Sequence, residues 1–277
     1  MRFCPEITEA KGTGVLMLTV GSCFSGIGGL ELGLEQTGGF KTKWQIEIDP
    51  YAFAVLAKHW PNVKRYKDIT AVSGEELERV DLICGGFPCQ DVSLAGTRSG
   101  LEGKRSTLWG EMYRLICEVK PRWVLAENVP GLFSSDAGQF FGNILRDLAI
   151  GGYDAEWNCL PAAAVGAPHI RNRVFILAYS RSESFSCGRI FRENSADIDV
   201  GWENSKEWGI DRVIPSMGTS LIRGLQTRWV ESNSKSKIPR MVDGIPCGLD
   251  RIKCLGNAVV PAVAKRIGEM ILKVESK

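Results

Sequence analysis

One cysteine of this chain stands in a context that suits nucleophilic chemistry. The segment Gly85-Gly-Phe-Pro-Cys-Gln90 places Cys89 just after an apolar run that is predicted to be a buried strand. A thiolate is a strong nucleophile, and backbone amides or nearby arginines stabilise it. Free cysteines are usually small buried core residues, but Pro88 and the polar residues that follow favour an exposed loop. We therefore interpret Cys89 as a candidate nucleophile and the remaining cysteines as structural.

Acidic and basic residues border two further apolar runs. Glu127 follows the run Trp123-Val-Leu-Ala126, and a partly desolvated carboxyl there would keep its proton and act as a general acid, a role worth about 10²–10⁴ in rate. Arg171 and Arg173 open another run, where strand alternation would send both to one face to meet a phosphate or a carbonyl. A helix cap or surface ion pair is the alternative for Glu127, and an exposed basic edge strand for the arginines.

A glycine-rich turn precedes the first predicted helix. Gly26-x-Gly28-Gly29 follows a β-type run, and Glu47 lies 19 residues after Gly28, at the end of the second predicted strand. In dinucleotide-binding folds this spacing places an acid on the ribose hydroxyls. The Gly-x-Gly-x-x-Gly pattern is incomplete because position 31 is Glu, so a structural turn is at least as good an interpretation. The pattern supports an adenosine-bearing cofactor in an α/β sheet.

Alternating strand and helix patterns must position these residues. The predicted strands are 15–20, 44–48, 80–84, 123–126 and 173–179. The predicted helices are 30–37, 51–59, 106–119, 140–150 and 261–274. This order predicts a parallel sheet with helices on both faces, and ligands at the carboxyl ends of its strands.

Length and composition predict a folded globular protein with a large and a small domain. The chain has 277 residues, of which 44% are hydrophobic and 24% charged. We expect a catalytic domain over 1–179, a loop-rich domain over 180–245, and a C-terminal segment, 246–277, that packs back on the first domain. Residues 1–164 carry 16 Lys and Arg against 20 Asp and Glu, whereas 165–277 carry 18 against 12. A basic half supplies phosphate contacts, although a solvated surface without a partner has the same charge.

The sequence disfavours membrane, secreted and metal-binding proteins. No apolar run approaches the roughly 18 residues of a membrane helix, and the N-terminal residues lack a secretory signal. We therefore expect no membrane partner and a cytoplasmic location. Nine cysteines without a Cys-x-x-Cys spacing, together with only two histidines, favour reduced thiols and no metal site.

The order of motifs resembles the DNA (cytosine-5)-methyltransferase family from Leu18 to about Ile271. The similar blocks are Phe24-Ser-Gly-Ile-Gly-Gly29, Glu47-Ile-Asp49, Asp68-Ile69, Gly86-Phe-Pro-Cys-Gln90, Glu127-Asn-Val129, Gly166-Ala-Pro-His-Ile-Arg-Asn-Arg173 and Leu255-Gly-Asn-Ala-Val-Val-Pro261. The short insert and Asp243-Gly-Ile-Pro246 look most like compact bacterial and phage members. The resemblance implies a Rossmann-like, class I S-adenosylmethionine-dependent methyltransferase sheet, with a target-recognition domain at 180–245 that binds double-stranded DNA.

The resemblance also implies roles for individual residues. Cys89 would attack C6 of a flipped-out cytosine and Glu127 would protonate its N3, while Arg173 orients the base and Arg171 completes the catalytic set; the methyl group then passes to C5. The expected cofactor-binding residues are Phe24, Ser25, Gly26, Ile27, Gly28, Gly29, Glu47, Ile48, Asp68, Ile69, Pro88, Leu108, Asn257 and Ala258. The expected DNA-binding residues are Gln90, Ser93, Arg105, Arg212, Arg223 and Arg228.

Alternatives and departures from the family pattern accompany this hypothesis. One branch of the family methylates transfer RNA with the same blocks, and Gln90 speaks mildly against it. A catalytically silent DNA-binding homologue would keep the fold but has no need of Cys89, Glu127 and Arg173. The departures are Ser22, Ile48 and His169, where relatives often have aspartate, an aromatic residue and glutamine. A monomer, and a cognate restriction endonuclease encoded nearby, are further expectations.

Overall fold

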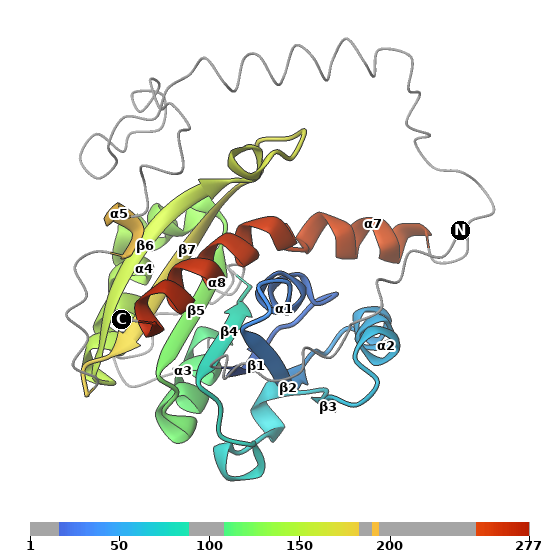
Figure 1. The fold of residues 1–277 in the computed structure, drawn as a ribbon, viewed down its shortest axis with the longest axis horizontal. Helices are drawn as coiled ribbons and strands as arrows, with labels where there is room; N and C mark the ends of the chain where they lie inside the picture. Colours follow the sequence, from blue (N-terminus) through green and yellow to red (C-terminus); the bar gives the residue numbers. More distant parts are fainter. Residues whose placement is uncertain (1–16, 89–107, 183–189, 194–247, 277) are drawn as a thin grey trace.

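A seven-stranded mixed sheet organises the part of the protein that the computed structural model describes, residues 17–88, 108–182, 190–193 and 248–276 (Figure 1). The strands lie in the order β3-β2-β1-β4-β5-β7-β6. They are β1 (Leu18–Cys23), β2 (Phe40–Ile46), β3 (Lys64–Tyr66), β4 (Leu82–Gly86), β5 (Trp123–Asn128), β6 (Tyr153–Pro161) and β7 (Asn172–Ser180). The α-helices are α1 (Gly29–Glu35), α2 (Pro50–His59), α3 (Leu108–Val119), α4 (Gln139–Ile150), α5 (Ile190–Glu193), α7 (Gly248–Asn257) and α8 (Pro261–Glu275).

The direction of the strands corrects the prediction of a parallel sheet. Neighbours from β3 to β5 are parallel, as predicted. Strand β7, however, runs antiparallel to both β5 and β6. The prediction is therefore wrong for this edge of the sheet, where β6 and β7 are consecutive strands that pair directly without a crossover helix. Strands β3 and β6 and helices α5 and α7 were not predicted.

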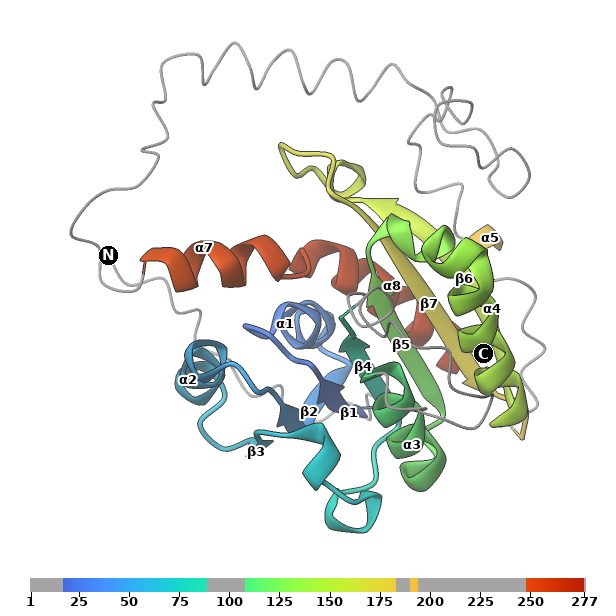
Figure 2. The same ribbon diagram turned by 180° about the vertical axis from the view of Figure 1, so that it is seen from behind.

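Two helical layers cover the sheet, one on each face (Figures 1 and 2). On one face, apolar side chains of α3 and α4, such as Met112 and Ile144, pack in one buried cluster with residues of the central strands. On the other face, α1 and α8 pack in a second cluster that contains Leu34 and Ile267. The predicted α/β fold with helices on both faces is confirmed.

Glycine permits the close approach of α1 and α8. A Cβ atom added to Gly33 would lie 2.1 Å from the carbonyl oxygen of Pro261 and 2.6 Å from the Cβ of Ala264. Both distances are far below van der Waals contact, so a larger residue at position 33 would push the helices apart. Helix α8 therefore packs directly on α1.

The predicted domain at 180–245 lies almost entirely outside the described residues. Its described part includes α5, whose Ile190 and Phe191 are buried in the same cluster as α8. The backbone N–H groups of these two residues donate to the carboxylate of Glu156 on β6, at 3.0 and 3.2 Å. These residues are thus part of the core of the sheet, and the limits of the three domains stay a prediction.

The strand order reverses between β1 and β4, the two adjacent strands at the centre of the sheet. In open α/β sheets, the loops that leave such a pair diverge and open a crevice at the carboxyl ends of the strands. The turn that contains Gly26 and Gly28 follows β1, and Phe87 and Pro88 follow β4. Within the described ranges, no helix combines the length and the apolar character needed to cross a membrane.

Candidate active site

A cavity of about 390 Å³ lies at the carboxyl ends of the parallel strands. Its size is within the range of small-molecule sites, about 300–1,000 Å³. The predicted cofactor-binding residues that line it are Phe24, Ser25, Gly26, Gly29, Glu47, Ile48, Asp68, Ile69, Pro88, Leu108, Asn257 and Ala258. The two others, Ile27 and Gly28, line an adjacent hollow with His169 and Arg171. Segments that are far apart in the sequence thus meet in one cavity.

The turn after β1 is held by the carboxylate of Glu47. The backbone N–H of Gly26 donates to Oε2 of Glu47 at 2.6 Å, and the N–H of Asp49 donates to Oε1 at 2.7 Å. Gly26 has a φ of 56°, and a Cβ added there would meet no atom within 4 Å. A carboxylate offers about four lone-pair sites, so Glu47 keeps acceptor capacity for hydroxyl groups of a ligand.

A buried polar cluster lies beneath this turn. Ser25 donates to the hydroxyl of Ser22 at 2.9 Å, and the amide of Gln45 donates to Glu31 at 3.3 Å. Glu31 has no solvent exposure, and burial raises the pKa of its carboxyl. Ser22, one of the three departures from the family pattern, therefore lies near a buried acid of α1. Glu31 was not predicted as part of the site, although its place beside Leu30 and Leu34 on the predicted helix is a usable signal.

The carboxyl of Glu127 is the most perturbed group of the cavity wall. Glu127, the last residue but one of β5, pairs with Gly86 of β4 and is 7% exposed. Its carboxylate forms an ion pair with Nε of Arg173 at 2.9 Å. A Cβ added to Gly86 would lie 2.9 Å from Oε2 of Glu127, so glycine leaves space for the carboxyl. Burial raises the pKa of Glu127 to about 7, against the opposing charges of Arg173 and Arg171. Such a group exchanges a proton near neutral pH.

Arg171 holds the C-terminal segment against the cavity. It precedes β7, which begins at Asn172, and has a φ of 32°. Its guanidinium donates to the carbonyl oxygens of Gly256 and Ala258, both at 2.7 Å. The carbonyl anticipated for this side chain is thus main chain of the protein itself, and the contact fixes Asn257 and Ala258 at the cavity. Its catalytic role stays a prediction.

Helix α7 also contacts the first half of the chain at the cavity. Lys253 pairs with Asp49 at 2.8 Å, and both residues line the cavity. Asp49 also accepts the N–H groups of Tyr51 and Ala52 at the start of α2. The hydrogen bond from Lys253, followed by these amides, lowers the pKa of Asp49. A charged contact therefore joins the C-terminal segment to the first half of the sheet.

Several predicted residues lie outside the described ranges, so that their roles stay predictions; they are Cys89, Gln90, Ser93, Arg105, Arg212, Arg223 and Arg228. The chain that leads to the first of them is nevertheless well fixed. The buried amide of Asn128 donates to the carbonyl oxygen of Phe87 at 3.0 Å, and its oxygen accepts the N–H of Val129 at 2.8 Å. The ring of Phe87 packs against Trp109 at a centroid distance of 5.2 Å. Asn128, to which the sequence analysis gave no role, thus ties the strand end of Glu127 to the backbone before Pro88.

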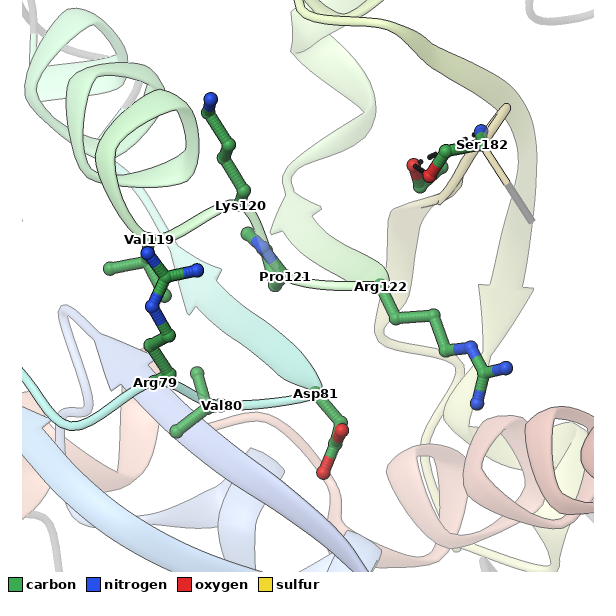
Figure 3. A pocket seen from close by; sticks show the side chains of 9 residues that line it. Arg79, Val80, Asp81, Val119, Lys120, Pro121, Arg122 and Ser182 are labelled. Carbon is green, nitrogen blue, oxygen red and sulfur yellow. Dashed lines mark hydrogen bonds between the residues drawn. The ribbon is translucent and has the colours of Figure 1, made fainter.

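A separate hollow, of about 430 Å³, lies away from the cavity, at the opposite end of β4 and β5 (Figure 3). Its charged side chains include two that stabilise the fold. Asp81 accepts the N–H and hydroxyl of Thr19, at 2.7 and 2.6 Å, and Arg122 pairs with Glu275 of α8 at 2.7 Å. No residue predicted for the active site lines this hollow. Across the described ranges, no group of three or more His, Cys, Asp or Glu side chains could hold a metal ion.

Comparisons with known proteins agree with this geometry. The family model for C-5 cytosine-specific DNA methylases matches residues 18–217. The type II methyltransferase M2.BsuMI of Bacillus subtilis is 41% identical over 165 residues, which are 58% of this chain and 42% of that protein. The type II methyltransferase M.Bsp6I of a Bacillus species is 36% identical over 171 residues, 61% of this chain and 54% of that protein. The chain thus spans about half the length of these relatives.

A solved structure supports the same fold. It is a prophage-encoded protein of E. coli, described as a DNA modification methyltransferase, with a TM-score of 0.53 and 30% sequence identity. The similarity covers 62% of this chain and 49% of that one. It extends over the larger part of this chain, as the family model does.

Proposed function

Since the chain belongs to the C-5 cytosine-specific DNA methylase family, we propose that it transfers a methyl group from S-adenosylmethionine to C5 of a cytosine in double-stranded DNA. The observation that carries the proposal is the buried, Arg173-paired carboxyl of Glu127 at the wall of the cavity. The pKa of about 7 at Glu127 suits a group that must give up a proton at neutral pH and take it back.

The cavity fits the proposed cofactor. Phe24, Ile69 and Leu108 offer apolar surface for a nucleobase, and Glu47 keeps free lone pairs for ribose hydroxyls. Gly26 has no side chain to block the space above the turn. S-adenosylmethionine supplies an electrophilic methyl group when it is bound here. The other predicted cofactor residues complete the proposed set; they are Ser25, Ile27, Gly28, Gly29, Ile48, Asp68, Pro88, Asn257 and Ala258.

The protein residues supply the proton transfers and the nucleophile. A cytosine inside a duplex must first be extruded, at a cost of a few kcal/mol. In the proposed reaction, the thiolate of Cys89 forms a bond to C6 while Glu127 donates its proton to N3, so that electron density gathers at C5. After methylation a water molecule accepts the proton of C5, and the electron pair of that C–H bond forms the C5–C6 double bond as the C6–S bond breaks to release the thiolate. N3 then returns its proton to the carboxylate of Glu127. Arg173, 2.9 Å from Glu127, orients the carboxyl toward the base.

The DNA contacts are proposed for the basic half of the chain. Residues 165–277 carry the excess of Lys and Arg, and we propose that the domain at 180–245 recognises the target sequence. Its arginines Arg212, Arg223 and Arg228 would read guanines or hold phosphates, and Gln90, Ser93 and Arg105 would contact the DNA near the flipped base. A monomer in the cytoplasm, paired with a cognate restriction endonuclease, is the proposed context.

Nucleoside mass spectrometry tests the reaction directly. The purified chain is incubated with S-adenosylmethionine and duplex DNA of mixed sequence, followed by bisulfite sequencing. We expect 5-methylcytosine at one sequence context with the natural chain and none with the Cys89→Ala variant. A parallel incubation with transfer RNA tests the second substrate, since one branch of the family has the same blocks. Absence of 5-methylcytosine from DNA would refute the proposal.

A further inference from the structure

One wall of the cavity has little regular structure of its own. Asp68 and Ile69 line the cavity, but they follow the three-residue edge strand β3 and lead into two single turns, η1 (Ile69–Ala71) and η2 (Gly74–Glu76). Most hydrogen bonds of this stretch are those of the turns, such as the N–H of Thr70 to Asp68 at 2.9 Å, and the hydroxyl of Tyr66 donates to the carbonyl oxygen of Glu76 at 3.0 Å. Short turns do not hold a position by themselves, so the wall needs support from a neighbouring element.

Arg114 of α3 supplies that support through two main-chain contacts. Its Nη2 donates to the carbonyl oxygens of Ile69 and of Val72, both at 2.9 Å. Two acids on the same helix fix the guanidinium, because Nε donates to Glu111 at 2.9 Å and Nη1 donates to Glu118 at 2.9 Å. A planar guanidinium satisfies such a set of acceptors in one orientation, whereas an ammonium group does not.

Glu118 and apolar packing extend the same contact. The N–H of Gly74 donates to Oε2 of Glu118 at 2.6 Å. A Cβ added to Gly74 would lie 2.4 Å from the Cβ of Glu118, so the backbone of the wall lies directly against the helix. Ile69 and Val72 are buried in one cluster with apolar residues of α3. The wall and the helix therefore form one unit.

Helix α3 also contributes to the cavity at its first residue. Leu108 begins α3 and lines the cavity, whereas Arg114 itself does not. Arg114 thus fixes the position of Ile69 relative to Leu108, and these are two of the apolar surfaces that a nucleoside would contact. A change in their separation would weaken the binding of a flat ring held by both.

We propose that Arg114 is a positioning residue for cofactor binding, which sets the affinity for the adenosine part of S-adenosylmethionine by fixing the 68–72 wall against α3 without touching the cofactor. The inference rests on the proposed function for the identity of that ligand. It assigns Arg114 no part in the chemical step.

Calorimetric titration of S-adenosylmethionine into the full chain, without DNA, tests the inference. We expect the Kd of Arg114→Met to rise about tenfold, because methionine keeps the apolar stem and loses every donor. The kcat of the variant at saturating cofactor should stay within about twofold of the natural value, since a positioning residue acts on ground-state binding. Arg114→Lys should restore only part of the affinity.

Arg181 offers a matched control at a distance from the cavity. Its Nη2 donates to the carbonyl oxygens of Ala149 and Tyr153, at 2.7 and 3.3 Å, and its Nε pairs with Asp154 at 3.0 Å. Arg181→Met removes the same kinds of contact and should lower the thermal midpoint without changing the Kd. An unchanged Kd in Arg114→Met, or an equal rise in both variants, would overturn the inference.

The titration also separates this inference from the proposed function. A natural chain that binds S-adenosylmethionine but makes no 5-methylcytosine counts against the proposed reaction alone, and the comparison of variants still decides the role of Arg114. A natural chain that does not bind S-adenosylmethionine overturns both.

Discussion

Replacement of Glu127 by glutamine is expected to remove a pH-dependent cost from the folded state. Burial raises the pKa of this carboxyl from 4.5 to about 7. Because the folded state then binds the proton more tightly than the unfolded state, the group stabilises the fold fully below about pH 4.5, and this contribution is lost as the pH rises to about 7. A tenfold change in proton affinity is worth about 1.4 kcal/mol, so the total is about 3 kcal/mol.

Urea unfolding at a series of pH values measures this cost. The free energy of unfolding of the natural chain, minus that of Glu127→Gln, should fall by about 2 to 3 kcal/mol between about pH 5 and about pH 8. The contributions of groups that both chains share cancel in this difference. Because glutamine stays neutral throughout, the remaining pH dependence is that of Glu127.

Asp68→Asn is the control for this experiment. The hydrogen bond from the N–H of Thr70 lowers the pKa of Asp68. The stability that this carboxyl contributes is therefore lost only as the pH falls below the ordinary pKa of an aspartate. The difference between the natural chain and Asp68→Asn should therefore stay flat from about pH 5 to about pH 8. If the natural chain and Glu127→Gln instead show parallel curves, the carboxyl ionises like an exposed one, and the argument for an acid at neutral pH is refuted.

Further predictions concern the nucleophile, the ion pair and the helix contact. Cys89→Ala should abolish methyl transfer and leave the calorimetric Kd for S-adenosylmethionine within about twofold; retained turnover would contradict its assignment. Arg173→Met should raise the pKa of Glu127 further and move the alkaline limb of the residual rate up by about one pH unit or more, since Arg173 favours the ionised carboxyl; an unmoved limb would exclude this coupling. Gly33→Ala should lower the free energy of unfolding by about 1–3 kcal/mol because its Cβ would overlap Pro261; an unchanged urea midpoint would show that α1 and α8 separate without cost.

Four of the five parallel strands, all except β3, were predictable because they contain short apolar runs that glycine and proline separate. The run before Gly85 and the run just before Glu127 gave β4 and β5, within two residues of their observed limits. Strand β6 has no such run, since Asp154, Glu156 and Asn158 alternate along it. The alternation in β6 is typical of a half-exposed strand. The direction of β7 has no signal in its own sequence, because it depends on the pairing of β7 with β6 in the folded protein.

The residues of the candidate site were likewise predictable only in part. Glu47 and Glu127 were predictable because each acid follows an apolar run, and the end of a parallel strand is where ligands bind. The partners of the arginines were not, since Arg171 binds carbonyl oxygens 85 and 87 residues away and Arg114 binds one 45 residues away. Every residue type carries a main-chain carbonyl, so no sequence pattern marks these acceptors.

Three arginines stabilise this cavity in two ways, which follow from where each guanidinium finds acceptors. Arg173 pairs with a buried carboxyl and opposes the rise of its pKa, whereas Arg171 and Arg114 hold main chain at two other walls. Loops that leave the ends of parallel strands have few main-chain partners of their own, and a guanidinium supplies up to five donors at one point. The shape of the cavity therefore depends on residues such as Arg114 that do not line it, and its affinity for a ligand is open to change by substitutions outside the contact surface.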